Sequence, residues 1–171
     1  MYKLKKFSRI LVAIDGSPQS IEAAEHGISM AKKDNADLIV MSVIHTIYTE
    51  TSHPMEVKDL IVMSVIHTPA SILIYATEKN FREFLKKCKE DTDNWFDTIR
   101  KKATEVGVPL RTETVEEIYS IPGAIIKYAE QEKADVIVVG GTGRSGFKKL
   151  LLGSVSGDVV RYARCPVMVV K

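Results

Sequence analysis

Short, nearly continuous apolar runs alternate along the chain with longer segments whose apolar residues recur every three or four positions. The short runs are typical of strands buried on both faces, and the longer spacing is typical of amphipathic helices. Strands are predicted at 9–15, 37–45, 110–115, 134–139 and 166–170. Helices are predicted to begin at Pro18, after a Ser17 N-cap, at Phe81, at Pro122 and near Val155. The alternation predicts a parallel sheet with helices on both faces, because each parallel connection must cross over the sheet.

One ten-residue sequence, Asp-Leu-Ile-Val-Met-Ser-Val-Ile-His-Thr, occurs at 37–46 and again at 59–68, an offset of 22 residues. Two identical copies do not make a solenoid, which needs three or more repeats. We interpret them as a local duplication within a single domain, residues 1–171, that carries about 22 surplus residues. Either copy could form the second strand. The first is favoured because the link that precedes it, 34–36, has an ordinary length.

Composition and charge exclude several classes of protein. The 171 residues are 45% hydrophobic, and 24 Lys and Arg against 22 Asp and Glu leave a formal charge of +2. This near-neutral chain gives no support to nucleic-acid binding. Its apolar runs are far shorter than the roughly 18 residues that a membrane helix needs, and no signal peptide is recognisable at the start. We therefore expect no membrane partner and a cytoplasmic location.

The sequence offers no committed catalytic or metal site. The four histidines are scattered, and none has carboxylates or cysteines beside it at metal-ligand spacing. Cys88 lies on the apolar face of a predicted helix, and Cys165 has no evident histidine partner for a nucleophilic role. We therefore predict no catalytic residue and no metal ligand, which favours a binding module over an enzyme.

A glycine-rich segment follows the fourth predicted strand, at the edge where open parallel sheets bind ligands. Glycines at 140, 141, 143 and 146 would let backbone amides approach a phosphate. The start of the last helix would add free N–H groups, and Ser154 and Ser156 could add hydroxyl donors. A P-loop is excluded because Phe147 stands where its lysine must be, and the dinucleotide-binding match is weak because the glycines follow the fourth strand.

Gly140, Gly143 and Gly153-Ser154 reproduce the spacing of the nucleotide-binding branch of the universal stress protein family: Gly, two residues, Gly, nine residues, Gly-Ser. With the surplus residues set aside, the chain resembles this family over essentially its whole length. Residues 10–17 are similar to the family's opening strand and acidic turn, and 165–170 to its last strand. The resemblance implies a three-layer α/β/α, Rossmann-like fold, related to the adenine nucleotide alpha hydrolases, with an open parallel five-stranded sheet in the order 3-2-1-4-5.

The same resemblance implies an ATP site, with Mg or Mn as an accompanying metal. Asp15 would face the adenosine, Ala13 would lie near the base, and Val43 or its copy Val65 would line the adenine pocket. The residues around the ribose and phosphates would be Gly140, Gly143, Arg144, Gly153, Ser154, Val155 and Ser156. From the residues alone, Asp15 is equally well explained as a turn or helix N-terminal acid, and Arg144 as a solvated loop charge.

The function implied is that of an ATP-binding stress-response or signalling protein whose nucleotide state regulates conformation or partner binding. Alternatives are a nucleotide-free dimerisation module and a slow ATP hydrolase or other nucleotide-dependent enzyme of the same fold. The resemblance also implies a homodimer in which the terminal strand, Val167 to Lys171, pairs across a two-fold axis. An apolar edge strand at the chain end needs a partner of this kind.

Overall fold

The computed structural model of the protein describes residues 6–49, 61–64, 78–117, 119–142 and 152–171. The strands are β1 (Arg9–Ile14), β2 (Asp37–Thr49), β3 (Ile61–Ser64), β4 (Leu110–Glu117), β5 (Val136–Gly140) and β6 (Val167–Val170). The helices are α1 (Pro18–Asp34), α2 (Glu78–Glu105), α3 (Ile121–Gln131) and α4 (Ser154–Tyr162). The predicted alternation of strands and helices is confirmed, with β3 as an addition.

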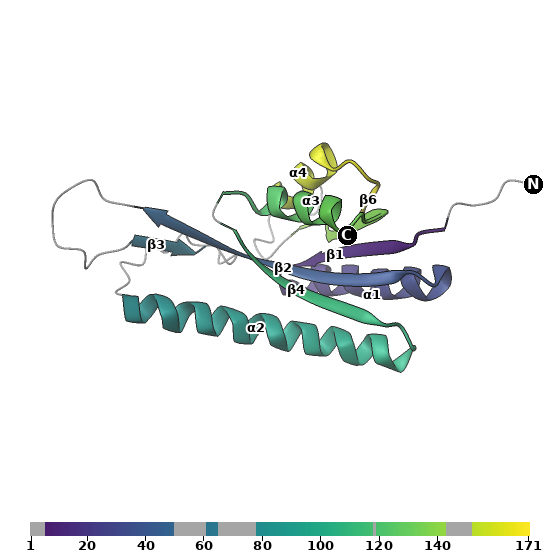
Figure 1. Cartoon of the computed structure of the whole chain (residues 1–171), viewed down its shortest axis with the longest axis horizontal. Coiled ribbons are helices and arrows are strands. Elements are labelled where there is room, and N and C mark those ends of the chain that lie inside the picture. Colours follow the sequence, from purple (N-terminus) through teal and green to yellow (C-terminus); the bar gives the residue numbers. More distant parts are fainter. Residues whose placement is uncertain (1–5, 50–60, 65–77, 118, 143–151) are drawn as a thin grey trace, which may run out of the picture.

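Five of the strands form a parallel sheet in the order β4-β2-β1-β5-β6 (Figure 1). In the centre of the sheet, Leu11 of β1 lies opposite Ile39 of β2 on one side and Ile137 of β5 on the other. Numbered along the predicted strands, this order is 3-2-1-4-5, so the predicted fold is confirmed. The chain passes from β1 to β2 and β4 on one side of β1 and then crosses to β5 and β6 on the other side, which creates a topological switch point at the carboxyl ends of β1 and β5.

The repeated sequence accounts for the sixth strand. The first copy lies in β2, between β1 and β4, as predicted. However, β2 continues to Thr49, beyond the predicted end at residue 45, and Thr46–Thr49 pair antiparallel with β3. Since β3 is part of the second copy, a segment of the same strand propensity covers one edge of a strand extension that neither β1 nor β4 reaches. Val65, also in the second copy, lies outside the described residues.

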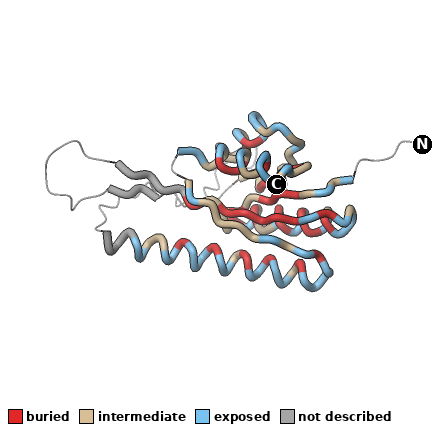
Figure 2. The backbone as a smooth tube through the Cα atoms, viewed as in Figure 1, coloured by how far each residue is buried: buried red, intermediate tan, exposed pale blue. Residues whose placement is uncertain are grey.

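The sheet separates two apolar layers, because successive side chains of a strand point to opposite faces. Val12 belongs to the layer beneath α1 and α2, and its neighbour Leu11 belongs to the layer beneath α3 and α4. Figure 1 shows the two helix pairs on opposite sides of the sheet, and Figure 2 shows buried residues concentrated along the central strands. Strands buried on both faces explain the continuous apolar runs of the sequence.

Local signals fix where α1 and α3 begin. Ser17 caps α1 by accepting a hydrogen bond from the Ser20 amide at 3.2 Å, with Pro18 in the first turn, as predicted. Ser120 caps α3 in the same way through the Gly123 amide, at 3.1 Å. The first cap matters for function because it lies directly after β1, at the switch point.

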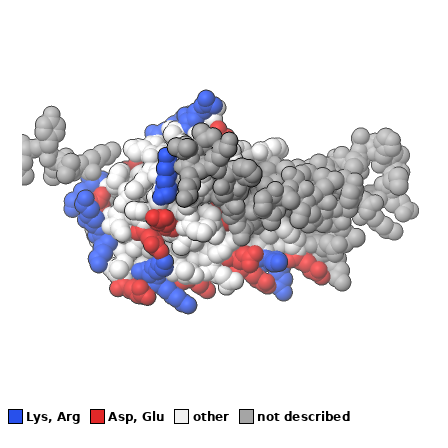
Figure 3. Space-filling view, turned by 180° about the vertical axis from the view of Figure 1, so that it is seen from behind, with Lys and Arg blue, Asp and Glu red and all other residues white. Residues whose placement is uncertain are grey.

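Charged side chains are mixed over the surface. Figure 3 shows basic and acidic groups next to one another over much of the face it presents. Several of these charges are paired on or beside α2: Lys86 with Glu90, Lys89 with Glu116, and Arg100 with Asp97. Of the helices that the structure describes, none has both the length and the apolar character needed to cross a membrane.

Candidate functional site

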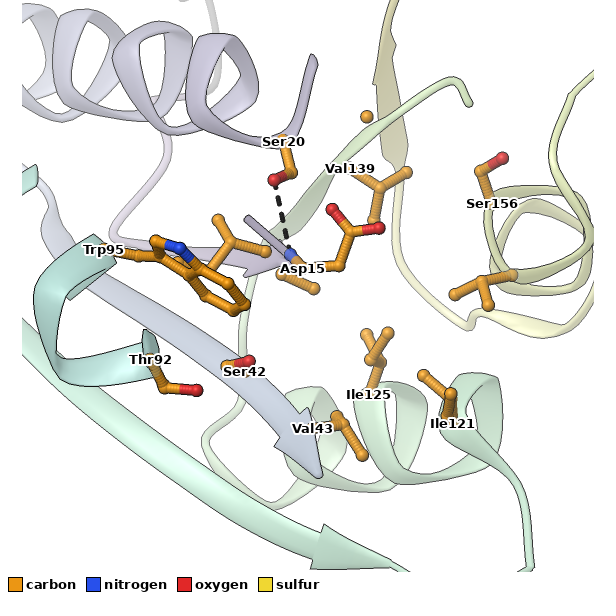
Figure 4. A pocket seen from close by; sticks show the side chains of 14 residues that line it. Asp15, Ser20, Ser42, Val43, Thr92, Trp95, Ile121, Ile125, Val139 and Ser156 are labelled. Carbon is orange, nitrogen blue, oxygen red and sulfur yellow. Dashed lines mark hydrogen bonds between the residues drawn. The ribbon is translucent and has the colours of Figure 1, made fainter. Parts of the chain in front are cut away.

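A pocket opens at the carboxyl ends of β1 and β5, beside Ser42 and Val43 of β2, where the strand order reverses (Figure 4). Its cavity volume is about 70 Å³. Six residues predicted from the sequence line it: Ala13, Asp15, Val43, Gly140, Val155 and Ser156. Lining residues that the sequence analysis missed include Ser20, Ser42, Thr92, Trp95, Ile121 and Ile125.

Asp15 lies in the turn that the residues alone suggested, and it also lines the pocket. Its Oδ1 accepts a hydrogen bond from the Ser17 amide at 3.0 Å, and its own amide donates to Ser20 Oγ at 3.3 Å. Gly16 makes this turn possible, with a φ of +76° that favours glycine. The half-buried carboxylate also lines the pocket. Among the described residues that line the pocket, it is the only charged side chain. It can therefore accept hydrogen bonds from a ligand while it holds the turn.

The N-terminus of α4 lies on the opposite side of the pocket from α2. Gly153 is its N-cap, no side chain caps it, and the first amide to bond within the helix is that of Gly157, which donates to Gly153 O at 2.8 Å. The amides of Ser154, Val155 and Ser156 therefore precede the intrahelical ladder. With the positive end of the helix dipole, they suit an anionic group such as a phosphate.

The Ser156 hydroxyl differs from its predicted use. It is buried and donates to the carbonyl oxygens of Gly141, at 2.9 Å, and Gly153, at 3.1 Å. The Gly153 amide donates to the same Gly141 carbonyl, and the Gly141 amide donates to Val170 O in β6. The single proton of this hydroxyl is shared between the two carbonyls and supports the direct bond between the two ends of the glycine loop, while the side chain remains part of the pocket wall.

Gly140 packs against the backbone of α1. A Cβ at this position would lie 3.0 Å from both the Gln19 carbonyl carbon and the Ser20 nitrogen. Two residues on, the Thr142 amide donates to Gln19 Oε1 at 3.1 Å, and the Thr142 hydroxyl donates to the same oxygen. The start of the loop is therefore fixed to α1. No sequence pattern singled out Gln19, because its partner is 123 residues away.

The remaining predicted residues divide between the described and the undescribed chain. Gly153 and Ser154 stand at the start of α4, at the far end of the loop. Gly143 and Arg144 lie outside the described residues, as does Val65. Val43 lines the pocket from β2, beside Ile121 and Ile125 of α3.

Neither described cysteine is poised as a nucleophile. Burial raises the pKa of the Cys88 thiol to about 11, and the nearby carboxylate of Asp91 adds to the shift. Burial also raises the pKa of Cys165. Both are protonated at neutral pH, and the thiolate is the reactive form. Over the part of the chain that the structure describes, no three His, Cys, Asp or Glu side chains gather to hold a metal ion.

The sequence profile of the universal stress protein family matches residues 6–171, so the chain belongs to that family. Universal stress protein MJ0531 of Methanocaldococcus jannaschii is 33% identical over 165 residues, covering 96% of this chain and 82% of the relative. The solved structure of MJ0577, from the same organism, has a TM-score of 0.70 and 26% identity and covers 98% of this chain and 97% of its own.

Some solved structures of this fold contain adenine nucleotides. The universal stress protein from Archaeoglobus fulgidus in complex with dAMP has a TM-score of 0.57 and 19% identity, and covers 98% of this chain and 100% of its own. Two others hold cAMP and AMP. At these identities the likeness to this chain is one of fold.

Proposed function

We propose that this protein binds ATP in the pocket at the switch point and that the bound nucleotide regulates its conformation or its choice of partner. One observation carries the proposal: a single pocket joins apolar walls, the Asp15 carboxylate and the start of α4. Apolar walls suit a purine base, a carboxylate suits ribose hydroxyls, and free helix amides suit phosphates. Membership of the family and the nucleotides in its solved members support the same ligand class.

The proposed role is binding, with any hydrolysis slow or dependent on a partner. No described lining residue is a histidine, lysine or cysteine that could act as a base or nucleophile. Mg²⁺ or Mn²⁺ would enter with the triphosphate, held chiefly by phosphate oxygens and water.

The first prediction concerns ATP itself. Protein stripped of nucleotide should bind one ATP per chain, and binding should change the emission of Trp95, the chain's one tryptophan, which lines the pocket. Asp15→Asn keeps the shape of the side chain but loses its charge, so the affinity should fall roughly 10- to 100-fold, the effect of losing a hydrogen bond to a charged acceptor. Calorimetric and fluorescence titrations, with Mg²⁺ and with EDTA, would measure this.

A control variant and a second site variant make that test specific. Asp34→Asn removes a carboxylate at the other end of α1, where Oδ2 accepts from the Phe7 amide at 3.0 Å, and should leave ATP affinity unchanged. Gly143→Val tests the glycine spacing of the loop and should abolish binding. A folded parent protein that binds no adenine nucleotide would refute the proposed function and favour the nucleotide-free dimerisation module.

We propose in addition that two copies of the chain pair through β6. Among the described strands, β6 has β5 as its neighbour and one side open. The carbonyls of Pro166 and Val170 accept from the Ile137 and Gly141 amides, at 3.0 and 2.6 Å. Because peptide groups alternate along a strand, the N–H and C=O of Val167 and Val169 face the open side, where a second β6 could bond to them.

A proline at one of these positions tests the pairing. Val169→Pro removes an outward N–H without removing a bond to β5. The chain should therefore still fold, but the open edge of β6 should no longer be able to pair with a second copy. We expect the dimer dissociation constant to rise at least about tenfold, as measured by analytical ultracentrifugation. Met168→Pro, which removes an inward N–H, should instead destabilise the fold. A monomeric parent, or a Val169→Pro variant that dimerises as well as the parent, would refute this interface.

A further inference from the structure

The pocket continues past the sheet edge onto the face covered by α1 and α2. Ala13 and Val43 belong to the layer beneath α3 and α4, whereas Ile14 belongs to the opposite layer. Ser42, which precedes Val43, points to the same side as Ile14 by strand alternation. Together with Thr92 and Trp95 of α2, Ile14 and Ser42 form what we call the α2 end of the pocket. Figure 4 shows Thr92 and Trp95 on the far side of Asp15 from Ser156.

Thr92 carries an unsatisfied polar group at this end. The residue is 1% exposed, and its Oγ1 has no hydrogen-bond partner among the described residues. A helical threonine commonly donates to a carbonyl one turn earlier, as Thr98 of the same helix does to Asn94 O at 3.0 Å. Thr92 instead directs its oxygen toward Ser42 and the pocket (Figure 4). Buried hydroxyls are nearly always paired, so this one requires an explanation.

The side chains at the α2 end of the pocket indicate which part of a nucleotide could bind there. The indole of Trp95 and the side chain of Ile14 give it apolar walls, and Ser42 and Thr92 give it neutral hydroxyls. No lysine or arginine is among the described lining residues, and the Asp15 carboxylate lies between this end and α4. A phosphate therefore belongs near the α4 amides. An uncharged, flat ring with hydrogen-bonding atoms on its edge suits the α2 end.

We propose that the hydroxyl of Thr92 pairs with the polar edge of the bound purine base and that Trp95 forms the wall beside that base. This inference rests on the nucleotide binding proposed above. It directs the polar edge of the base toward α2, past Ala13 and Val43, which the family resemblance places beside the base. A hydroxyl can donate one hydrogen bond and accept others, so it can match either a ring nitrogen or an exocyclic amine. Binding would then satisfy a group that is unpaired in the free protein.

The experiment compares three variants of the full chain with the parent. Thr92→Val keeps the size of the side chain but removes the hydroxyl, Thr92→Ser keeps the hydroxyl, and Thr98→Val removes an exposed hydroxyl of the same helix as a control. Calorimetry with ATP and with AMP gives the affinities. Thermal unfolding without nucleotide gives the stability of each variant.

We expect Thr92→Val to lower the affinities for ATP and for AMP by the same factor, about fivefold to tenfold. Thr92→Ser and Thr98→Val should keep both affinities of the parent. The melting temperature of free Thr92→Val should equal or exceed that of the parent, since an unpaired buried hydroxyl is removed.

Three results would overturn the inference. They are unchanged ATP affinity in Thr92→Val, a loss for ATP that AMP does not share, and a lower melting temperature of the free variant, which would make the hydroxyl a structural group. The first of these would leave the proposed function standing, because the parent would still bind ATP. Failure of the parent itself to bind ATP would remove the proposed function and this inference with it.

Discussion

Gly16→Ala is expected to lower the free energy of unfolding by about 2 to 5 kcal/mol and to displace Trp95 from the pocket wall. Gly16 has a φ of +76°, and a Cβ there would lie 2.2 Å from two atoms of the indole ring of Trp95. The variant therefore combines backbone strain with overpacking, which cost about 1 to 2 and 1 to 3 kcal/mol respectively. Chemical denaturation measures the first effect, and the emission of Trp95 reports the second.

Gly107→Ala separates the two contributions. Gly107 has nearly the same backbone angle, a φ of +71°, but a Cβ there would meet no atom within 4 Å. This variant should be destabilised only by the backbone strain, about 1 to 2 kcal/mol, and should leave Trp95 emission unchanged. Equal losses in the two variants would show that the ring of Trp95 does not rest on Gly16. Because Trp95 lines the pocket, Gly16→Ala should also weaken ATP binding.

Gly140→Ala is expected to destabilise the protein by about 1 to 3 kcal/mol, even in the absence of nucleotide. The added Cβ would lie 3.0 Å from backbone atoms of Gln19 and Ser20, which cannot rotate away as a side chain can. The first turn of α1 would have to separate from β5 at the switch point. Denaturant unfolding of the free protein measures this cost.

Gly157→Ala is the matched comparison for Gly140→Ala. Gly157 lies inside α4, its Cβ would come no closer than 3.9 Å to Leu152 Cβ, and alanine favours the helix. The free energy of unfolding of Gly157→Ala should therefore exceed that of the parent by about 0.5 to 1 kcal/mol. If Gly140→Ala is as stable as the parent, α1 does not pack on β5 as the structure shows. The expected result also means that lost ATP binding in a Gly140 variant would not by itself prove a phosphate contact.

The order of the elements could be predicted from the sequence because its signals are local. The apolar runs at 9–15 and 134–139 identify strands buried on both faces, and Ser17 with Pro18 identifies the start of a helix. Their order then leaves few parallel topologies. Six residues of the pocket lining could be named in advance because the resemblance to the universal stress protein family implied them, and that resemblance rests on local features, the glycine spacing and the strand ends.

The missed half of the site comes from contacts between residues that are distant in the sequence. Thr92 and Trp95 follow the helical period of α2, and that period places them on its apolar face without saying what lies opposite. Gln19 reaches Thr142 across 123 positions. The extension of β2 to Thr49 also depends on its pairing with β3, which is a contact between separate segments of the chain.

The sequence by itself determined the element order, the parallel sheet and the edge of that sheet where a ligand would bind, because propensity, capping and periodicity act over a few residues. The tertiary structure decided which copy of the repeat enters the sheet, that the Ser156 hydroxyl holds the loop together, and that Thr92 is buried without a partner. Each of these depends on how closely two elements approach. That distance is set by the packing of the whole core, which no short segment of sequence contains.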